Sequence, residues 1–492
     1  MNMQDTAYKQ AMSLKTGRGL LLALIMIVPG WLHAQQAGLV LDDVVQQVLL
    51  ENPQLQIGRQ QVLHAEALHD QADGQFDWGV YANAGLERRY VPVARGDLLT
   101  TGSTLSRYWT TQMGVRKKFQ NGVSIGPGVA LYSSDDDVEE AAFQTVSRPM
   151  VNLNIPLMRG AGKQVVTADS NAAAGLVEAV RAEGRYAAAQ VLTSAVIAYW
   201  KALAATERLS VLERAEVPAA AFVTSLQQLV EQGESPPAVH DQARADLMLR
   251  HLEISQASSE LQSARRQLAA ALGSATFEPQ VTGQLPRLGA LREPAPADDA
   301  SFTRMALERR PDLVALKQRL KAQDIRLLAA RDQLRPKVDL SVDLEHVMLR
   351  YEQSLGQRTA AGGVAQKQAT LEELRLQLQQ RERQVHTEVR DALALLHSAR
   401  RDSEQATAAV KLYLTLVKEA RRKAGLGEAA NSEYTLMQDR LARSHAKAIA
   451  ARLQYATALA SLRLATGTTG IEQADRPALI AQRFRAWNNS DE

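Results

Sequence analysis

The stretch ENPQL at residues 51–55 begins a helical segment, and RRPDL at residues 309–313 begins a similar one 258 positions later (309 − 51). The later parts of the chain align with a different offset, 194, which pairs the Gly-Glu dipeptides at 233–234 and 427–428 (427 − 233). The second copy is therefore 64 residues shorter (258 − 194), and the shortfall lies between about 345 and 363. This self-similarity predicts two unequal copies of one structural unit.

Long helices are predicted in both copies. Residues 164–231 and 365–424 are helical in pattern, and a helix of about 60 residues extends roughly 90 Å. Apolar side chains recur at steps of three and four, as in Leu192, Val196 and Tyr199, which predicts coiled-coil contacts. Each long helix turns at a Gly-Glu pair and returns through a shorter helix, at 237–272 or 430–466.

The part of the first copy that has no counterpart in the second copy shows a β-strand pattern. Four runs alternate apolar and polar side chains, and each is near the roughly 9–11 residues that a tilted membrane strand needs: 78–86, 109–119, 123–131 and 151–157. The polar segments 91–107 and 133–147 are predicted to be exposed loops. The second copy keeps one alternating run, at 338–345, and a short candidate return strand at 347–351. Alternation alone also fits a soluble sheet with one wet face.

Aromatic side chains fall near the ends of the first two runs, at Trp78, Tyr81, Tyr108 and Trp109. They could form an interfacial girdle in a membrane, and they could equally pack between strands.

The N-terminal region predicts export. Lys15 and Arg18 precede an apolar stretch, 20–28, that is too short to span a bilayer, and Ala34 offers a small residue for cleavage. The net charge of +3 gives no reason to expect a nucleic-acid partner, and the absence of cysteine excludes thiolate metal sites. No motif for an enzyme, a cofactor or a metal site is recognised.

Four features, in this order along the chain, resemble the TolC-like outer-membrane efflux family, the outer membrane factors. The resemblance covers residues 41–467 and rests on ENPQL at 51–55 with its echo RPDL at 310–313, on NIPLMRG at 154–160, on the two Gly-Glu tips, and on the helix ends ALG at 271–273 and ATG at 465–467.

The resemblance implies a mainly α fold with a β part. Long antiparallel coiled-coil helices would form an α-barrel, and a few membrane strands would enter a β-barrel shared by a homotrimer. The implied function is a passive outer-membrane channel with a large periplasmic part, in a tripartite efflux or type I secretion system with a periplasmic adaptor and an inner-membrane transporter. By resemblance, the adaptor would contact the helix tips, at Gly233, Glu234, Ser235, Gly427, Glu428 and Ala429.

The family often carries acidic side chains that narrow the periplasmic entrance of the pore. Glu433 and Asp439 are the candidates here, although their spacing differs from the family's close pair and both could be solvated helix-surface acids. The shortened second copy also leaves open a different function, that of a non-conducting periplasmic coiled-coil scaffold.

The expected organisation is a signal peptide at 1–34, a first repeat at 35–273 with strands at about 77–157, a proline-rich linker at 274–300, a second repeat at 301–467 and a tail at 468–492.

Overall fold

The computed structural model describes residues 38–93, 102–136, 144–274, 279–288, 299–425 and 431–469. The described residues from Leu39 onward belong to one compact unit. The predicted signal peptide, the second tip at 427–429, most of the linker and all of the tail from residue 470 lie outside the described residues.

The described residues of the first half of the chain form five α-helices, a short 3-10 helix and four strands. They are α1 (Leu41–Glu51), α2 (Pro53–Asp73), η1 (Gly74–Phe76), β1 (Gly79–Val93), β2 (Gly102–Lys118), β3 (Ser124–Asp136), β4 (Gln144–Pro156), α3 (Lys163–Val166), α4 (Ala168–Glu231) and α5 (Pro237–Leu272). The return helix, predicted at 237–272, is confirmed.

The second half follows the same order with a shorter β part. Its elements are α6 (Asp299–Arg309), α7 (Pro311–Asp332), β5 (Lys337–Val342), β6 (Val347–Glu352), α8 (Arg358–Gly425) and α9 (Asn431–Thr466). The candidate return strand, predicted at 347–351, is thus confirmed as β6. In both halves a proline begins the second helix, where a missing N–H is tolerated and the fixed φ suits a first turn.

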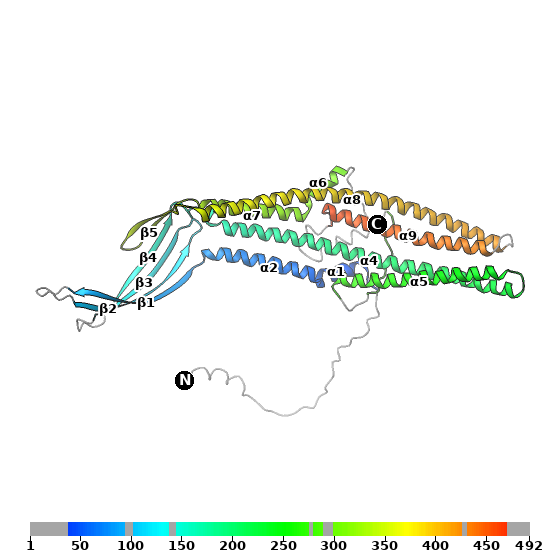
Figure 1. Ribbon diagram of the computed structural model, residues 1–492, viewed down its shortest axis with the longest axis horizontal. Coiled ribbons are helices and arrows are strands. Elements are labelled where there is room, and N and C mark those ends of the chain that lie inside the picture. Colours follow the sequence, from blue (N-terminus) through cyan, green and yellow to red (C-terminus); the bar gives the residue numbers. More distant parts are fainter. Residues whose placement is uncertain are drawn as a thin grey trace, which may run out of the picture. The chain divides into compact units, whose positions relative to one another are not determined.

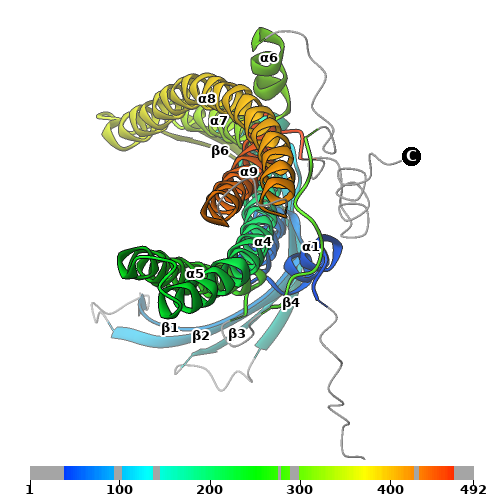
Figure 2. The same ribbon diagram turned by 90° about the vertical axis from the view of Figure 1, so that its right-hand side faces the viewer.

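Helices α2, α4, α7 and α8 lie side by side in this order, and the strands extend from one end of them (Figure 1). At the other end α4 pairs with α5, and α8 with α9, as two antiparallel hairpins. Seen along the long axis, these helices follow an arc (Figure 2). The arrangement therefore combines a curved layer of long helices with a sheet that continues from it.

Helix α4 supplies most of the core between the two halves. Its buried side chains include Leu192, Val196 and Trp200, which pack in one cluster with Val385 and Val389 of α8. By length and composition α4 is apolar enough to cross a membrane, but 61% of its most apolar window is buried inside the unit. Its hydrophobicity therefore serves coiled-coil packing, as the spacing of apolar residues predicted.

A buried ionic cluster joins α4, α7 and α8. Arg310 is fully buried and donates hydrogen bonds to Asp312 at 2.9 Å, to Glu388 at 2.5 Å and to the hydroxyl of Tyr186 at 2.8 Å. Arg381 donates to Asp312 at 2.8 Å. Burial alone would raise the pKa of Asp312, but the hydrogen bonds and charges of the two arginines outweigh it and lower that pKa below its ordinary value. The two carboxylates of the cluster pair with the positive charge of Arg310, which would otherwise be costly to bury.

The six strands within the described residues form one antiparallel sheet in the order β1-β2-β3-β4-β5-β6. The turn between β2 and β3 is made by Asn121 and Gly122, where Gly122 has a φ of 95° and the side chain of Asn121 accepts from the N–H of Val123 at 3.0 Å. An Asn-Gly pair suits such a tight turn, because both residues tolerate a positive φ.

The predicted exposed loops at 91–107 and 133–147 are wrong over much of their length. Strand β1 continues to Val93, β2 begins at Gly102, β3 continues to Asp136 and β4 begins at Gln144; only 94–101 and 137–143 fall outside the described residues. The backbone ladder of a hairpin does not depend on apolar side chains, so the pairing extends beyond the region of clear alternation.

Candidate functional site

The sheet has one apolar face. Strand register and alternation place these side chains on the same side: Val80, Ala82, Ala84, Leu86, Trp109, Met113, Val115, Val129, Leu131 and Val151. Several are well exposed, and Val80 reaches 84%. We call this set the apolar face. A soluble chain would normally cover such a contiguous surface.

The opposite side of the same strands is polar. It carries Tyr81, Asn83, Gln112, Arg116, Arg148 and Asn152. Here Arg148 lies beside the ring of Tyr132, with its guanidinium carbon 5.9 Å from the ring centre. A sheet that is apolar on one side and polar on the other suits a wall between lipid and water.

Charged residues mark both ends of the apolar face. Glu87, Arg88 and Arg89 follow it on β1, and Lys117 and Lys118 end it on β2. Residues 79–87 between these ends extend roughly 30 Å along the strand at about 3.3 Å per residue. With the tilt of a barrel strand, this length matches the height of an apolar membrane band, about 25 Å.

The aromatic residues divide between the two faces. Trp78 and Trp109 belong to the apolar side, at opposite ends of it, and are 57% and 50% exposed. The amino group of Lys117 lies 5.2 Å from the ring centre of Trp78. Tyr81 and Tyr108 alternate to the polar side. The girdle interpretation therefore suits the two tryptophans and not the tyrosines.

The far end of the α4–α5 hairpin carries the first predicted tip. Gly233 has a φ of 75°, a conformation that favours glycine, and its N–H donates to the carbonyl of Val230 at 3.0 Å. The N–H of Glu234 donates to the carbonyl of Leu229 at 2.8 Å, and Ser235 leads into α5. These bonds fix the tip as a tight turn. Gly427, Glu428 and Ala429 lie outside the described residues.

Near this end, an ion pair connects the two halves of the chain. Arg250 of α5 contacts Asp439 of α9 at 2.7 Å, and their side chains are only 12% and 21% exposed. Arg250 also donates to the backbone carbonyl of Ala215 on α4 at 3.0 Å. Arg443 reaches the other oxygen of Asp439 at 3.0 Å. One carboxylate thus holds α5 and α9 together.

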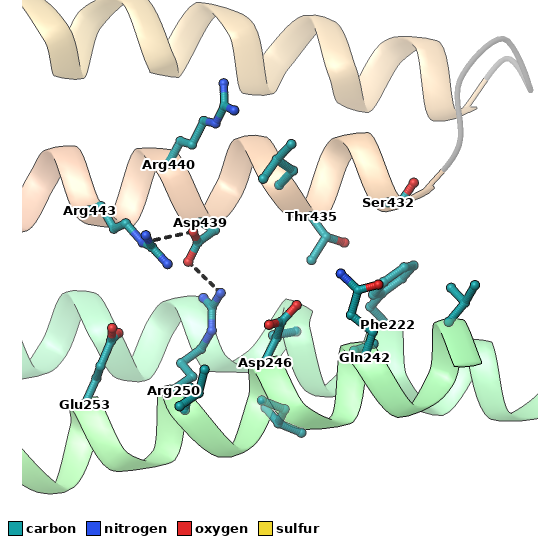
Figure 3. Close-up of a pocket in the computed structure, with 16 residues that line it drawn as sticks. Phe222, Gln242, Asp246, Arg250, Glu253, Ser432, Thr435, Asp439, Arg440 and Arg443 are labelled. Carbon is teal, nitrogen blue, oxygen red and sulfur yellow. Dashed lines mark hydrogen bonds and ion pairs between the residues drawn. The ribbon is translucent and has the colours of Figure 1, made fainter. Parts of the chain in front are cut away.

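This ion pair crosses a groove of about 570 Å³ between the hairpins (Figure 3). In the figure the side chains of Arg250 and Arg443 both point toward Asp439, while Phe222 and Gln242 lie nearer the tip. The groove is lined by both acidic and basic groups, including Asp246, Glu253 and Arg440. Among the described residues, no cluster of His, Asp and Glu could hold a metal ion.

The two acids proposed for the entrance have different surroundings. Glu433 is exposed in the first turn of α9, where the helix dipole favours a negative charge. Asp439 is six residues further, about 240° around the helix. The structure does not bring the two together, and the solvated alternative fits Glu433 only.

Sequence reasoning missed Arg250 and Arg443 as partners of Asp439, and it missed the ion pair of Arg452 on α9 with Glu207 on α4, at 2.5 Å. The internal repeat gives no signal for either contact, because α5 and α9 are equivalent helices of the two copies and the repeat does not specify how they meet. The i,i+4 spacing of Asp439 and Arg443 is the one local signal in the sequence.

No protein-family model matches the sequence, and no curated protein sequence matches it. Solved structures do match its fold. CmeC, an outer membrane channel of Campylobacter jejuni, has a TM-score of 0.63 and 14% identity, with 97% of this chain and 98% of that chain covered.

Two further solved structures match the same fold. CusC, described as forming a transmembrane channel, has a TM-score of 0.64 and 16% identity, with 87% of this chain and 92% of that chain covered. The open state of the MtrE outer membrane channel of Neisseria gonorrhoeae has a TM-score of 0.62 and 15% identity, with 87% and 88% covered. At these identities the likeness shows the fold, which is the coiled-coil-plus-strand fold expected from the resemblance.

Proposed function

We propose that this chain is an outer-membrane channel that works as a homotrimer and provides a passive path for substrates delivered from the periplasmic side. The observation that carries the proposal is the apolar face, bounded at each end by charged residues and backed by a polar face. The fold shared with outer membrane channels and the predicted signal peptide support the same proposal.

A trimer would complete both layers. The sheet has open strand edges, β1 among them, and open edges are not tolerated in lipid, where no water satisfies backbone groups. The helix layer likewise ends at α2 and α8. Both carry exposed leucines or isoleucines that would gain from burial against a neighbouring chain: Ile57, Leu63 and Leu68 on α2, and Leu376 and Leu395 on α8.

The hairpin ends would form the periplasmic entrance. By resemblance, the tips at Gly233–Ser235 and Gly427–Ala429 would contact a periplasmic adaptor, which would connect the channel to an inner-membrane transporter. The ion pair of Arg250 and Asp439 would restrain the α8–α9 hairpin against α4–α5. We therefore assign Asp439 a role in holding the entrance narrow and leave Glu433 as a surface acid.

Fractionation and conductance test the proposal. The expected result is a heat-modifiable trimer in outer-membrane fractions that conducts in planar bilayers. A salt-extractable periplasmic protein that does not conduct would reject the channel and favour the coiled-coil scaffold. A variant with Met113→Lys serves as a control, because it should lose membrane assembly while leaving the helical part intact.

A further inference from the structure

We infer that β4 of one chain pairs with β1 of the next, so that β1 to β4 alone form the wall inside the membrane and the β5–β6 hairpin stays at its inner boundary. The inference rests on the proposed function, because it requires the sheet to lie in lipid as a homo-oligomer. The partner that pairs with the open strand edge is a second copy of this chain.

The second hairpin is too short to cover β4. β5 and β6 have six residues each, and β5 pairs with β4 only from Leu153 to Pro156. The other nine residues of β4, 144–152, pair with β3 on one side. On their other side the described part of the chain offers no strand. β1 has a similar open side along its whole length.

These two open edges span the same range of positions along the strands, as the strand register shows. Following the register across the sheet, Ala82 pairs with Met113, which pairs with Val129, which pairs with Pro149. In the same way Leu86 is level with Thr145. Continued in this register, residues 79–87 of β1 lie at the level of residues 152–144 of β4. This is the span of the apolar face.

The paired residues of the β5–β6 hairpin lie below that level, toward the helices, because Val342 at the end of β5 pairs with Leu153. The turn after Val342 contains Asp343, Glu345 and His346, all exposed, and the side chain of Arg148, on the polar side of the sheet, forms an ion pair with Glu345 at 3.3 Å. Carboxylates are costly in lipid and suit a membrane boundary. The hairpin therefore ends where the apolar face begins and does not separate β4 from the next chain within the apolar band.

Strand direction permits the pairing. β1 runs away from the helices and β4 runs back toward them, so β4 and the β1 of the neighbouring chain would be antiparallel. Each unpaired backbone group in lipid costs several kcal/mol, so these edges need partners. Pro149 of β4 has no N–H, so β4 offers one backbone donor fewer than its length suggests. Three copies of four strands would close the wall, and the shortened second copy would not interrupt it.

Disulfide cross-linking in outer-membrane preparations tests this, and the cysteine-free chain gives a clean background. Ser147→Cys on β4 is combined in turn with cysteine at Val80, Ala82, Ala84 and Leu86 on β1, all on the same face as Ser147. The scan covers the register between chains. At least one combination should give cross-linked dimers and trimers on denaturing gels. Leu349→Cys on β6, which follows Ile155 of β4 in the register, is combined with the same four positions on β1, and no β6–β1 pair should cross-link.

An intrachain pair controls for folding. Leu131→Cys with Ser147→Cys joins two residues that face each other within the sheet, and it should cross-link without forming oligomers. Oligomers from any β6–β1 pair, with none from any β4–β1 pair in a conducting trimer, would overturn the inference and leave the channel proposal standing. Absence of the protein from the outer membrane would overturn the channel proposal itself.

Discussion

Asn52 and Arg310 occupy equivalent positions in the two halves of the chain and make the same contact with different chemistry. The amide of Asn52 donates to the carbonyl of Ala271 at 2.8 Å, and the guanidinium of Arg310 donates to the carbonyl of Ala465 at 3.2 Å. Each carbonyl lies two residues before a glycine with positive φ, Gly273 or Gly467. Both side chains thus tie the start of one helix to the end of the return helix. Of the two side chains, only that of Arg310 also donates hydrogen bonds to two carboxylates and a tyrosine hydroxyl.

Arg310→Ala should therefore destabilise the protein much more than Asn52→Ala. Removing the fully buried guanidinium takes away one of the two arginines that pair with Asp312, and breaking a buried pair costs about 3–5 kcal/mol. Loss of the Asn52 cap and hydrogen bond costs about 1–2 kcal/mol. Thermal unfolding of the purified variants at one scan rate measures the order. Equal shifts in Tm would contradict the importance of the cluster.

The same cluster predicts sensitivity to acid. The pKa of Asp312 is lower in the folded chain than in the unfolded chain, so the unfolded state binds more protons as the pH falls. The stabilisation is complete above the ordinary pKa of an aspartate and is lost as the pH falls through the lowered value, from about pH 5 downward. Asp312→Asn should be less stable than the parent at pH 7 and should show a smaller loss of Tm between pH 6 and pH 3. An unchanged pH profile would count against the assignment.

Met113 and Gln112 form a matched pair for testing the two faces of the sheet. They are adjacent on β2, near the middle of the apolar face, and point to opposite sides. Met113→Lys should greatly reduce the amount of assembled trimer in the outer membrane, because a lysine facing lipid at mid-depth costs about 2–4 kcal/mol per chain. Gln112→Lys adds the same charge to the polar side and should assemble normally. Similar losses in both variants would argue for a soluble sheet.

The long helices and the return helices could be predicted from sequence because apolar spacing, prolines at helix starts and Gly-Glu turns are all local signals. The hairpin turn at Asn121-Gly122 was equally local. Strand ends were not predictable in this way, because pairing beyond residue 90 on β1 depends on the partner strand and not on the side chains of β1. The 64-residue shortfall could be predicted from the two sequence offsets. Its consequence, that β5 pairs with only four residues of β4, could be seen only from the strand register in the structure.

The entrance was only half predictable. Asp439 could be proposed from its place after the second tip, yet its partner Arg250 lies 189 residues earlier in sequence, on a helix that, like α9, packs against α4. Nothing in the pattern of α5 distinguishes Arg250 from the other arginines on that helix. The contact follows from the arc of helices, which sequence periodicity does not fix.

Disrupting the Arg250–Asp439 pair should open the entrance. Asp439→Ala removes the ion pair between α5 and α9 and the Asp439–Arg443 pair within α9, and it leaves Arg250 held only by the carbonyl of Ala215 on α4. The side chains of Arg250 and Asp439 are mostly buried, so their pair is expected to contribute more than an exposed one, whose typical worth is about 0–1 kcal/mol. Single-channel conductance in planar bilayers should rise and the block by divalent cations should change. Glu433→Ala is the matched control, since it removes one exposed carboxylate from the same helix and should leave conductance and cation block as in the parent. If Glu433→Ala altered the block and Asp439→Ala did not, the entrance would have to be reassigned to the exposed acid near the tip.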